Sequence, residues 1–149
     1  MALQERVSDD LKKAMKSGEK QRVSVLLMMK SAIDNAQIAR RETLDDADVI
    51  EVLSREAKRT RESIAEFKKA NRQDAVEKEE SELVVILEYL PQQMSRDEIA
   101  ELVRQVIVEV GAQSPKDKGK VMSKLMPQLK GKAEGQLVNE VVTQALEAI

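Results

Sequence analysis

The sequence predicts an all-α fold in which four long helices form a bundle or hairpin and a small three-helix subdomain follows. Three observations favour this fold. Ala, Glu, Lys, Leu and Val dominate the 149 residues, whereas Gly (5) and Pro (3), which interrupt helices, are scarce. Between these breakers, apolar residues recur at steps of three and four. No stretch shows the strict alternation of apolar and polar residues that is typical of a half-buried strand.

Capping residues, glycine and proline predict the boundaries of the long helices. Gly18 ends the first helix, because glycine readily takes the left-handed conformation found at helix ends. Thr43, with Asp46 three residues later, resembles a capping box and begins the third helix. The fourth helix ends before Pro91, because the residue that precedes a proline avoids the helical region. The four helices are expected over residues 3–17, 19–40, 43–70 and 73–90.

A Pro-Gln-Gln-Met-Ser segment separates two expected domains, residues 1–92 and residues 93–149. Ser95 and Glu98 form a capping box for the fifth helix, which Gly111 ends. A proline at its first position opens the sixth helix, and a second proline ends it. A Lys-Gly-Lys loop then leads to the seventh helix.

Composition excludes several classes of function. The chain has no Cys and no His, so thiol and imidazole catalysis are impossible and zinc loses its usual ligands. We therefore expect no catalytic residue, no metal site and no cofactor. The longest apolar runs have five residues, whereas a bilayer span needs roughly 20, and the first residues lack the apolar core of a secretory signal. A cytoplasmic protein without membrane contact is expected, which agrees with the absence of disulfides.

Charge is unevenly distributed along the chain, although the formal net charge is only −2. Residues 45–114 carry 10 basic and 17 acidic side chains. Residues 116–132 carry six lysines and one aspartate. The middle of the chain is therefore acidic, and one C-terminal stretch is strongly basic.

Three stretches carry a resemblance to a known family that extends over essentially the whole chain. They are Leu53–Ser63 with Phe67–Asp74, Glu79–Gln93 with its Tyr-Leu-Pro-Gln-Gln end, and Gly119–Pro127 with Lys130–Asn139. Together these stretches resemble the YqeY family. The last stretch is also similar to the tail of GatB, a subunit of the tRNA-dependent amidotransferase that makes Gln-tRNA or Asn-tRNA from mischarged forms.

This resemblance implies a helical module associated with tRNA that lacks the kinase and transamidation domains. It links the chain to carbon–nitrogen ligase (amidotransferase) activity, but no ATP-binding loop or amidase nucleophile stands in these residues. We therefore expect a protein that is not itself an enzyme.

The basic stretch supplies the candidate nucleic-acid-binding residues. Several ammonium groups on one face would release counterions when RNA binds, and glycine lets the backbone approach a phosphate closely. The alternative is a solvated helix rim without a ligand. The candidates are Lys118, Lys120, Lys124, Lys130, Gly131 and Lys132.

Three further clusters have plainer interpretations. A secondary candidate contact is Arg55, Lys58, Arg59 and Arg61, which an exposed helix bearing ion pairs also explains. Glu56 is assigned to the charged outer faces of that same helix. The carboxylates of Glu77, Glu79, Glu80 and Glu82 indicate a solvated acidic face, and the methionines Met28, Met29, Met122 and Met126 indicate core positions.

Two main hypotheses of function remain open. The favoured one is a non-catalytic accessory protein that binds tRNA or another structured RNA through the basic C-terminal subdomain. The alternative is a protein-interaction adaptor, or an accessory subunit linked to glutamine-dependent carbon–nitrogen ligase activity. With one Phe and one Tyr in the whole chain, RNA recognition would rely on backbone and shape.

Overall fold

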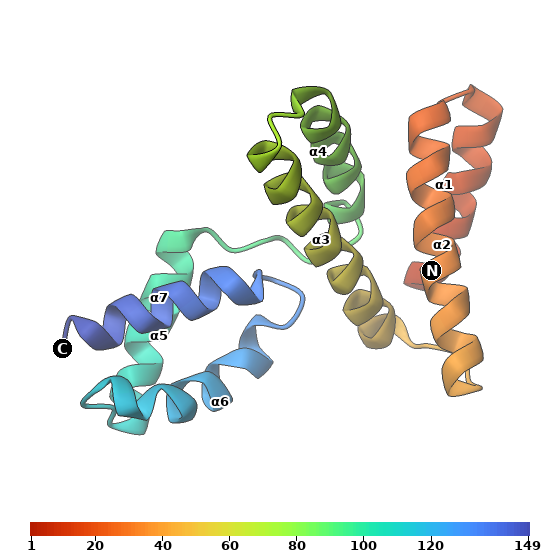
Figure 1. Cartoon of the computed structure of the whole chain (residues 1–149). Coiled ribbons are helices and arrows are strands. Elements are labelled where there is room, and N and C mark those ends of the chain that lie inside the picture. The colour runs from red at the N-terminus through yellow and green to blue at the C-terminus, as the bar shows by residue number, and fades with distance from the viewer. The chain divides into compact units, whose positions relative to one another are not determined.

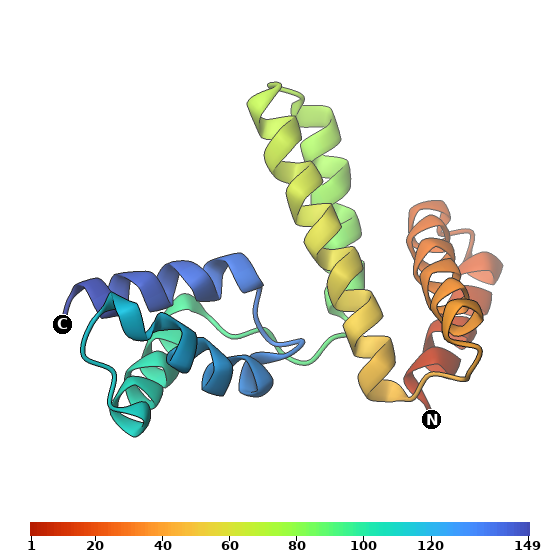
Figure 2. The same ribbon diagram turned by 60° about the horizontal axis from the view of Figure 1, so that its bottom comes forward.

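The computed structural model describes residues 1–149, and the chain is all-helical, as predicted (Figure 1 and Figure 2). The chain divides into two compact units, Met1–Pro91 and Gln92–Ile149. The first unit contains α1 Leu3–Ser17, α2 Lys20–Arg40, α3 Asp46–Lys69 and α4 Gln73–Leu87. The second contains α5 Arg96–Val110, the short 3₁₀ helix η1 Pro115–Asp117, α6 Lys118–Leu129 and α7 Gly135–Glu147.

Helices α1 and α2 form a hairpin whose turn depends on Gly18. This residue has a φ of 71° and lies in the left-handed region, as predicted. Helix α1 contributes a narrow buried stripe of Val7, Leu11 and Ala14. Helix α2 packs against α1, α3 and α4, and α3 likewise contacts the other three helices of the first unit.

The connection from α2 to α3 corrects one prediction. The N-cap of α3 is Asp45 rather than Thr43, and its carboxylate accepts a hydrogen bond from the Asp48 N–H at 2.9 Å. Leu44 is buried, and its own N–H donates to Gln37. Because Leu44 is buried, the helix begins at Asp46, after Leu44 and the N-cap Asp45.

The end of α4 corrects a second prediction. The helix stops at Leu87, three residues earlier than expected, and the chain turns through Glu88 and Tyr89. Tyr89 is only 3% exposed. Its side chain points back to the α1–α2 hairpin, which requires the backbone to leave the helix before Pro91.

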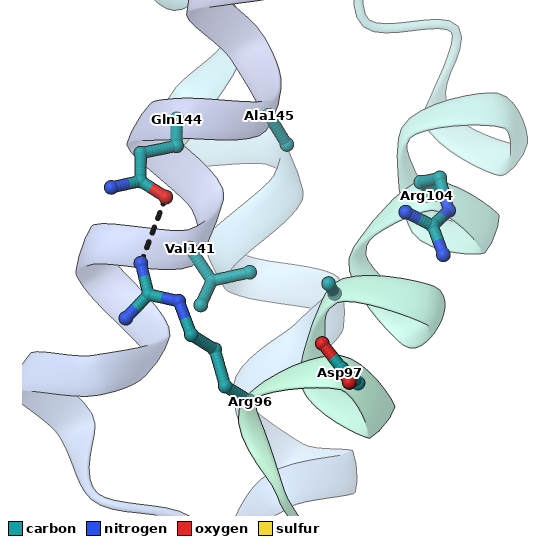
Figure 3. Close-up of a pocket in the computed structure, with 7 residues that line it drawn as sticks. Arg96, Asp97, Arg104, Val141, Gln144 and Ala145 are labelled. Carbon is teal, nitrogen blue, oxygen red and sulfur yellow. Dashed lines mark hydrogen bonds between the residues drawn. The ribbon is translucent and has the colours of Figure 1, made fainter.

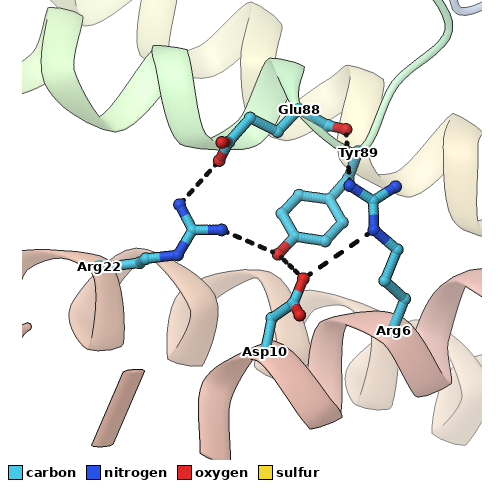
Figure 4. A network of polar contacts seen from close by, with 5 residues as sticks. All are labelled: Arg6, Asp10, Arg22, Glu88 and Tyr89. Atoms are coloured by element: carbon cyan, nitrogen blue, oxygen red, sulfur yellow. Dashed lines mark hydrogen bonds and ion pairs between the residues drawn. The ribbon is translucent and has the colours of Figure 1, made fainter. Parts of the chain in front are cut away.

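Figure 4 shows the polar network around Tyr89, which joins three helices of the first unit. The Tyr89 hydroxyl donates to the Asp10 carboxylate at 2.5 Å, and the Arg6 guanidinium lies 4.5 Å from the centre of the Tyr89 ring. Arg22 forms an ion pair with Glu88 at 2.8 Å. The network therefore holds the end of α4 against both α1 and α2.

The second unit has a separate aliphatic core, to which all three of its α-helices contribute. The capping box of Ser95 and Glu98 and the left-handed Gly111 are present, as predicted. The expected end of α6 before Pro127 was wrong, because the helix continues to Leu129, which is buried. Full burial of a leucine contributes about 1.5–3 kcal/mol, which offsets much of the roughly 3 kcal/mol cost of an interior proline. The buried residues of this core are Ile99, Val103, Val106, Val121, Leu125, Leu129, Val138, Val141, Val142 and Leu146.

The four methionines that were assigned to the core divide between core and surface. Met29 is fully buried, and Met28 and Met122 are half-buried. Met126 is 37% exposed, so its assignment to the core was wrong.

Replacement of Tyr89 by Phe tests the network. We expect the free energy of unfolding near neutral pH to fall by about 1–2 kcal/mol, because the buried end of the Asp10 carboxylate loses a hydrogen bond. Urea unfolding followed by circular dichroism measures this change. An unchanged midpoint would contradict a stabilising role of the hydroxyl.

The stability difference between wild type and Tyr89→Phe should also depend on pH. Burial, and after it the hydrogen bond to Asp10, raises the pKa of Tyr89 from 10.0 to about 12. A higher pKa in the folded state favours the protonated phenol, so this contribution is present below about pH 10 and is lost as the pH rises through about 12. The difference in stability between wild type and Tyr89→Phe should therefore shrink across this range. A difference that stays constant would contradict the assignment.

Candidate nucleic-acid interface

The predicted lysines of α6 do not share one face. Lys120 and Lys124 lie one turn apart and are exposed. Lys118 lies two residues before Lys120, which places it on nearly the opposite side of a helix with 3.6 residues per turn, and it is half-buried. The structure thus brings Lys120 and Lys124 together and separates Lys118 from them.

The loop after α6 presents Lys130 and Lys132 on either side of Gly131, which has a φ of 77°. Two hydrogen bonds hold this loop against the chain that enters α5. The Gln93 side chain donates to the Gly131 carbonyl at 2.8 Å, and the Met94 N–H donates to the Lys132 carbonyl at 2.8 Å. Gln93 and Met94 are therefore in direct contact with the Lys-Gly-Lys sequence, although the two segments are far apart in the chain.

Carboxylates of the same unit pair with two of the predicted lysines. Lys120 lies 3.8 Å from Asp117, and Lys124 lies 3.3 Å from Glu109. A hydrogen bond from the Gln113 N–H lowers the pKa of Asp117, so this carboxylate stays ionised. Exposed pairs of this kind contribute roughly 0–1 kcal/mol, so a phosphate can replace the carboxylate at little cost.

The second unit as a whole is not basic, although the sequence predicted a basic subdomain. It carries eight Lys and Arg side chains against eight Asp and Glu side chains. Six of the eight cations lie in residues 116–132, together with Asp117 alone. The carboxylates gather on α5 and α7, at Asp97, Glu98, Glu101, Glu109, Glu140 and Glu147.

The secondary candidate on α3 is a face of alternating charge. Arg55 pairs with Glu51 at 3.3 Å, and Arg59 pairs with Glu56 at 3.4 Å. Lys58 is exposed beside them. Arg61 lies about 120° around the helix from Arg55 and is half-buried, so it does not belong to the same face.

A groove of about 360 Å³ between α2, α3 and α4 corrects the assignments of two carboxylates. Glu56, expected on the outer surface, is 9% exposed and faces this groove. Glu82 also lines it, and burial, together with the nearby Glu79, raises the pKa of Glu82. Ser31, Asn35, Thr60 and Ser63 contribute further polar groups. The acidic side chains of α4 are therefore partly turned inward instead of forming one solvated face.

Neither a metal cluster nor a membrane span is found. The structure groups no three His, Cys, Asp or Glu side chains in an arrangement that could hold a metal ion. None of the helices combines the length and the apolar character that are needed to cross a bilayer.

Comparison with known proteins identifies the family. A model of the family described as Yqey-like protein matches residues 4–146 of this chain. The chain belongs to the YqeY family. "Altered inheritance of mitochondria protein 41, mitochondrial" from Pyrenophora tritici-repentis is 30% identical over 148 residues, which are 96% of this chain and 80% of that protein. An uncharacterized protein of Schizosaccharomyces pombe is 34% identical over 93 residues, which are 62% of this chain and 76% of that protein.

This YqeY-family chain also has a notch between α5 and α7 that was not predicted from the sequence (Figure 3). Its volume is about 250 Å³, and Ala100, Val141 and Ala145 supply its apolar lining. Arg96 and Arg104 approach it from α5. No sequence signal marks these residues, because the notch exists only where α5 and α7 meet.

Both arginines of the notch are engaged with neighbouring side chains. Arg96 reaches across to α7, where it donates to Gln144 at 2.8 Å and pairs with Glu140 at 3.4 Å. Arg104 pairs with Glu101 at 2.5 Å, and this contact lowers the pKa of the Glu101 carboxyl. The notch is thus an apolar depression with a rim of neutralised charge.

Replacement of Gln93 by Ala tests how the lysine loop is held in YqeY-family proteins. We expect faster amide exchange in residues 130–132, because loss of the hydrogen bond to Gly131 removes about 1 kcal/mol of local stability. Hydrogen–deuterium exchange with mass spectrometry measures this. Gln92→Ala, at the exposed neighbouring position, is the control and should leave exchange unchanged. Equal exchange rates in the two variants would contradict the role of Gln93.

Proposed function

We propose that this chain is a non-catalytic accessory protein that binds tRNA or another structured RNA through the η1–α6 segment and the loop that follows it. The lysines that carry the proposal are Lys120, Lys124, Lys130 and Lys132, with Lys118 on a separate side of α6. A phosphate backbone binds more tightly to a surface with several ammonium groups, because each contact releases a counterion.

The single observation that supports this proposal most strongly is the separation of charge within the second unit. Residues 116–132 hold six lysines, whereas α5 and α7 together hold six carboxylates and only two arginines. A unit without net charge therefore has one basic segment and a pair of acidic helices. A polyanion is attracted to the first and repelled by the second, which fixes the side of the unit on which it binds.

The absence of aromatic side chains from this unit bears on what is recognised. The only Phe and the only Tyr of the chain, Phe67 and Tyr89, both belong to the first unit, and Tyr89 is buried. Base stacking on aromatic rings therefore has no place in the second unit. Recognition would use the phosphate backbone and the shape of folded RNA.

The four-lysine variant tests the proposal. Replacement of Lys120, Lys124, Lys130 and Lys132 by Ala should weaken binding to bulk tRNA. It should also flatten the dependence of log K on log salt by about one for each lysine that contacts a phosphate. Fluorescence anisotropy between about 50 and 200 mM salt measures both quantities.

A matched control for this variant removes the same number of charges from the turn between α3 and α4. In it, Lys68, Lys69, Arg72 and Lys78 are replaced by Ala, and affinity should stay within about twofold of wild type. The proposal would be contradicted if tRNA binding were insensitive to salt, or if wild type did not bind tRNA at about 50 mM salt.

The α5–α7 notch supports a second candidate function, that of a protein-interaction adaptor. An apolar depression inside a polar rim has the form of an interface hot spot. The acidic surroundings disfavour RNA at this place. Ala100→Arg should fill the notch and abolish any one-to-one complex that survives nuclease treatment, while Gln105→Arg, on an exposed position of the same helix, should not. A complex that persists with Ala100→Arg would exclude the notch.

Two broader expectations also stay proposals. An accessory role in carbon–nitrogen ligase activity is tested by adding the purified protein to an amidotransferase assay with ATP, glutamine and mischarged tRNA. Cytoplasmic location is tested by fractionation of cells, since the relative from Pyrenophora tritici-repentis bears a name that places that protein in mitochondria.

A further inference from the structure

The turn between α1 and α2 is surrounded by lysines that no prediction had singled out. Lys12, Lys13, Lys16 and Lys20 are all exposed, and none of them forms an ion pair in the structure. We call these four residues the α1–α2 lysine corner. The carboxylates nearest in sequence are Asp10 and Glu19. Neither pairs with these lysines, and Asp10 instead contacts Arg6 and Tyr89. The corner therefore keeps its positive charge.

A second helical turn of the same unit gives a contrast. The turn between α3 and α4 also carries several cations, but three of them have a carboxylate partner. Lys68 pairs with Glu80 at 3.9 Å, and Lys69 pairs with Glu66 at 3.6 Å. Arg72 pairs with Asp74 at 3.4 Å. Both turns carry several cations. Those of the α1–α2 turn have no carboxylate partner and remain available to a ligand, whereas three of those at the α3–α4 turn are paired.

The helix dipoles favour a lysine at only some positions of the lysine corner. Lys16 lies in the last turn of α1, where a positive charge is favourable. Lys20 begins α2, where the partial charge of the helix is already positive and a lysine is unfavourable. Glu19 occupies the N-cap, but its side chain accepts no capping hydrogen bond, and the first turn of α2 contains no acidic residue. An anion beside this turn would compensate both the lysines and the uncapped end of α2.

We infer that the α1–α2 lysine corner is a second phosphate-contacting surface for the same structured RNA. This inference rests on the proposed function. The first unit would then contribute directly to RNA binding, although that unit is acidic as a whole. At physiological ionic strength the Debye length is about 8 Å, so carboxylates that lie farther than this from the corner are largely screened from it.

An anionic membrane is the competing ligand for such a corner. A helix that binds a bilayer surface needs an apolar face free to enter the lipid. The apolar face of α1, formed by Val7, Leu11 and Ala14, is buried against the rest of the unit. Met15, at 53% exposure, is the only exposed apolar side chain among the lysines. One methionine provides too little apolar area, so phosphate groups of RNA fit the corner better.

The test compares three variants of the full chain with wild type. The corner variant carries Lys12→Ala, Lys13→Ala, Lys16→Ala and Lys20→Ala. The other two are the four-lysine variant of the second unit and the α3–α4 turn variant described above, which remove the same number of charges. Thermal unfolding by circular dichroism verifies that each variant folds. Binding is then measured with bulk tRNA over a series of salt concentrations, and with vesicles of phosphatidylserine and phosphatidylcholine.

The inference predicts that the corner variant binds tRNA at least about tenfold more weakly than wild type and loses about two or more from the salt slope. The α3–α4 variant should stay close to wild type. If wild type binds tRNA and the corner variant binds equally well, the inference fails while the proposed function stands. If wild type does not bind tRNA, both fail. Loss of vesicle binding with unchanged tRNA binding would overturn the inference and assign the corner to lipid.

Discussion

Burial of the aliphatic side of α2 is the constraint on which the first unit depends. Val25, Leu26, Met29 and Ile33 are almost completely removed from water, and each contributes about 1.5–3 kcal/mol. Because α2 packs against α1, α3 and α4, these four side chains occupy the middle of the unit. The chain has one Phe and one Tyr, and Tyr89 is the only aromatic ring buried in this core. Close packing of aliphatic side chains along the helices supplies the stability instead.

The Tyr89 network completes this arrangement at the end of the unit. Aliphatic packing alone would let the last turn of α4 fray, because its final carbonyls have no partners. Tyr89, Glu88 and the arginines of α1 and α2 replace those missing contacts with directional ones. The chain therefore leaves the first unit at Pro91 from a fixed point. On the other side of that boundary, Gln93 and Met94 fix the loop that carries Lys130 and Lys132.

Electrostatics gives each unit a different character. In the second unit, equal numbers of positive and negative side chains are separated between the α6 segment and the α5–α7 pair. In the first unit, many cations are paired with carboxylates, whereas the four lysines of the α1–α2 lysine corner have no such partner. The net charge of a unit reveals neither of these features. What matters for a polyanion is which cations remain unpaired and share a surface.

Capping and glycine signals predicted helix ends well where a local interaction decides them. Gly18, Gly111 and the capping box of Ser95 act within a few residues of themselves, so the sequence alone locates them. The predictions failed at Thr43, at the end of α4 and at Pro127. In each case the burial of a nearby side chain in the core of its unit, namely Leu44, Tyr89 or Leu129, outweighed the local preference.

Sequence by itself determined the helical class, the family, the exclusion of thiol and imidazole chemistry and the location of the basic stretch. These follow from residue types and from periodicities of a few residues. Only the tertiary structure decided that Lys118 stands apart from Lys120 and Lys124, that Glu56 is buried, and that the four lysines of the α1–α2 lysine corner have no carboxylate partner. The physical reason is that a contact between side chains depends on distance in space, which helix packing sets and which order along the chain does not reveal.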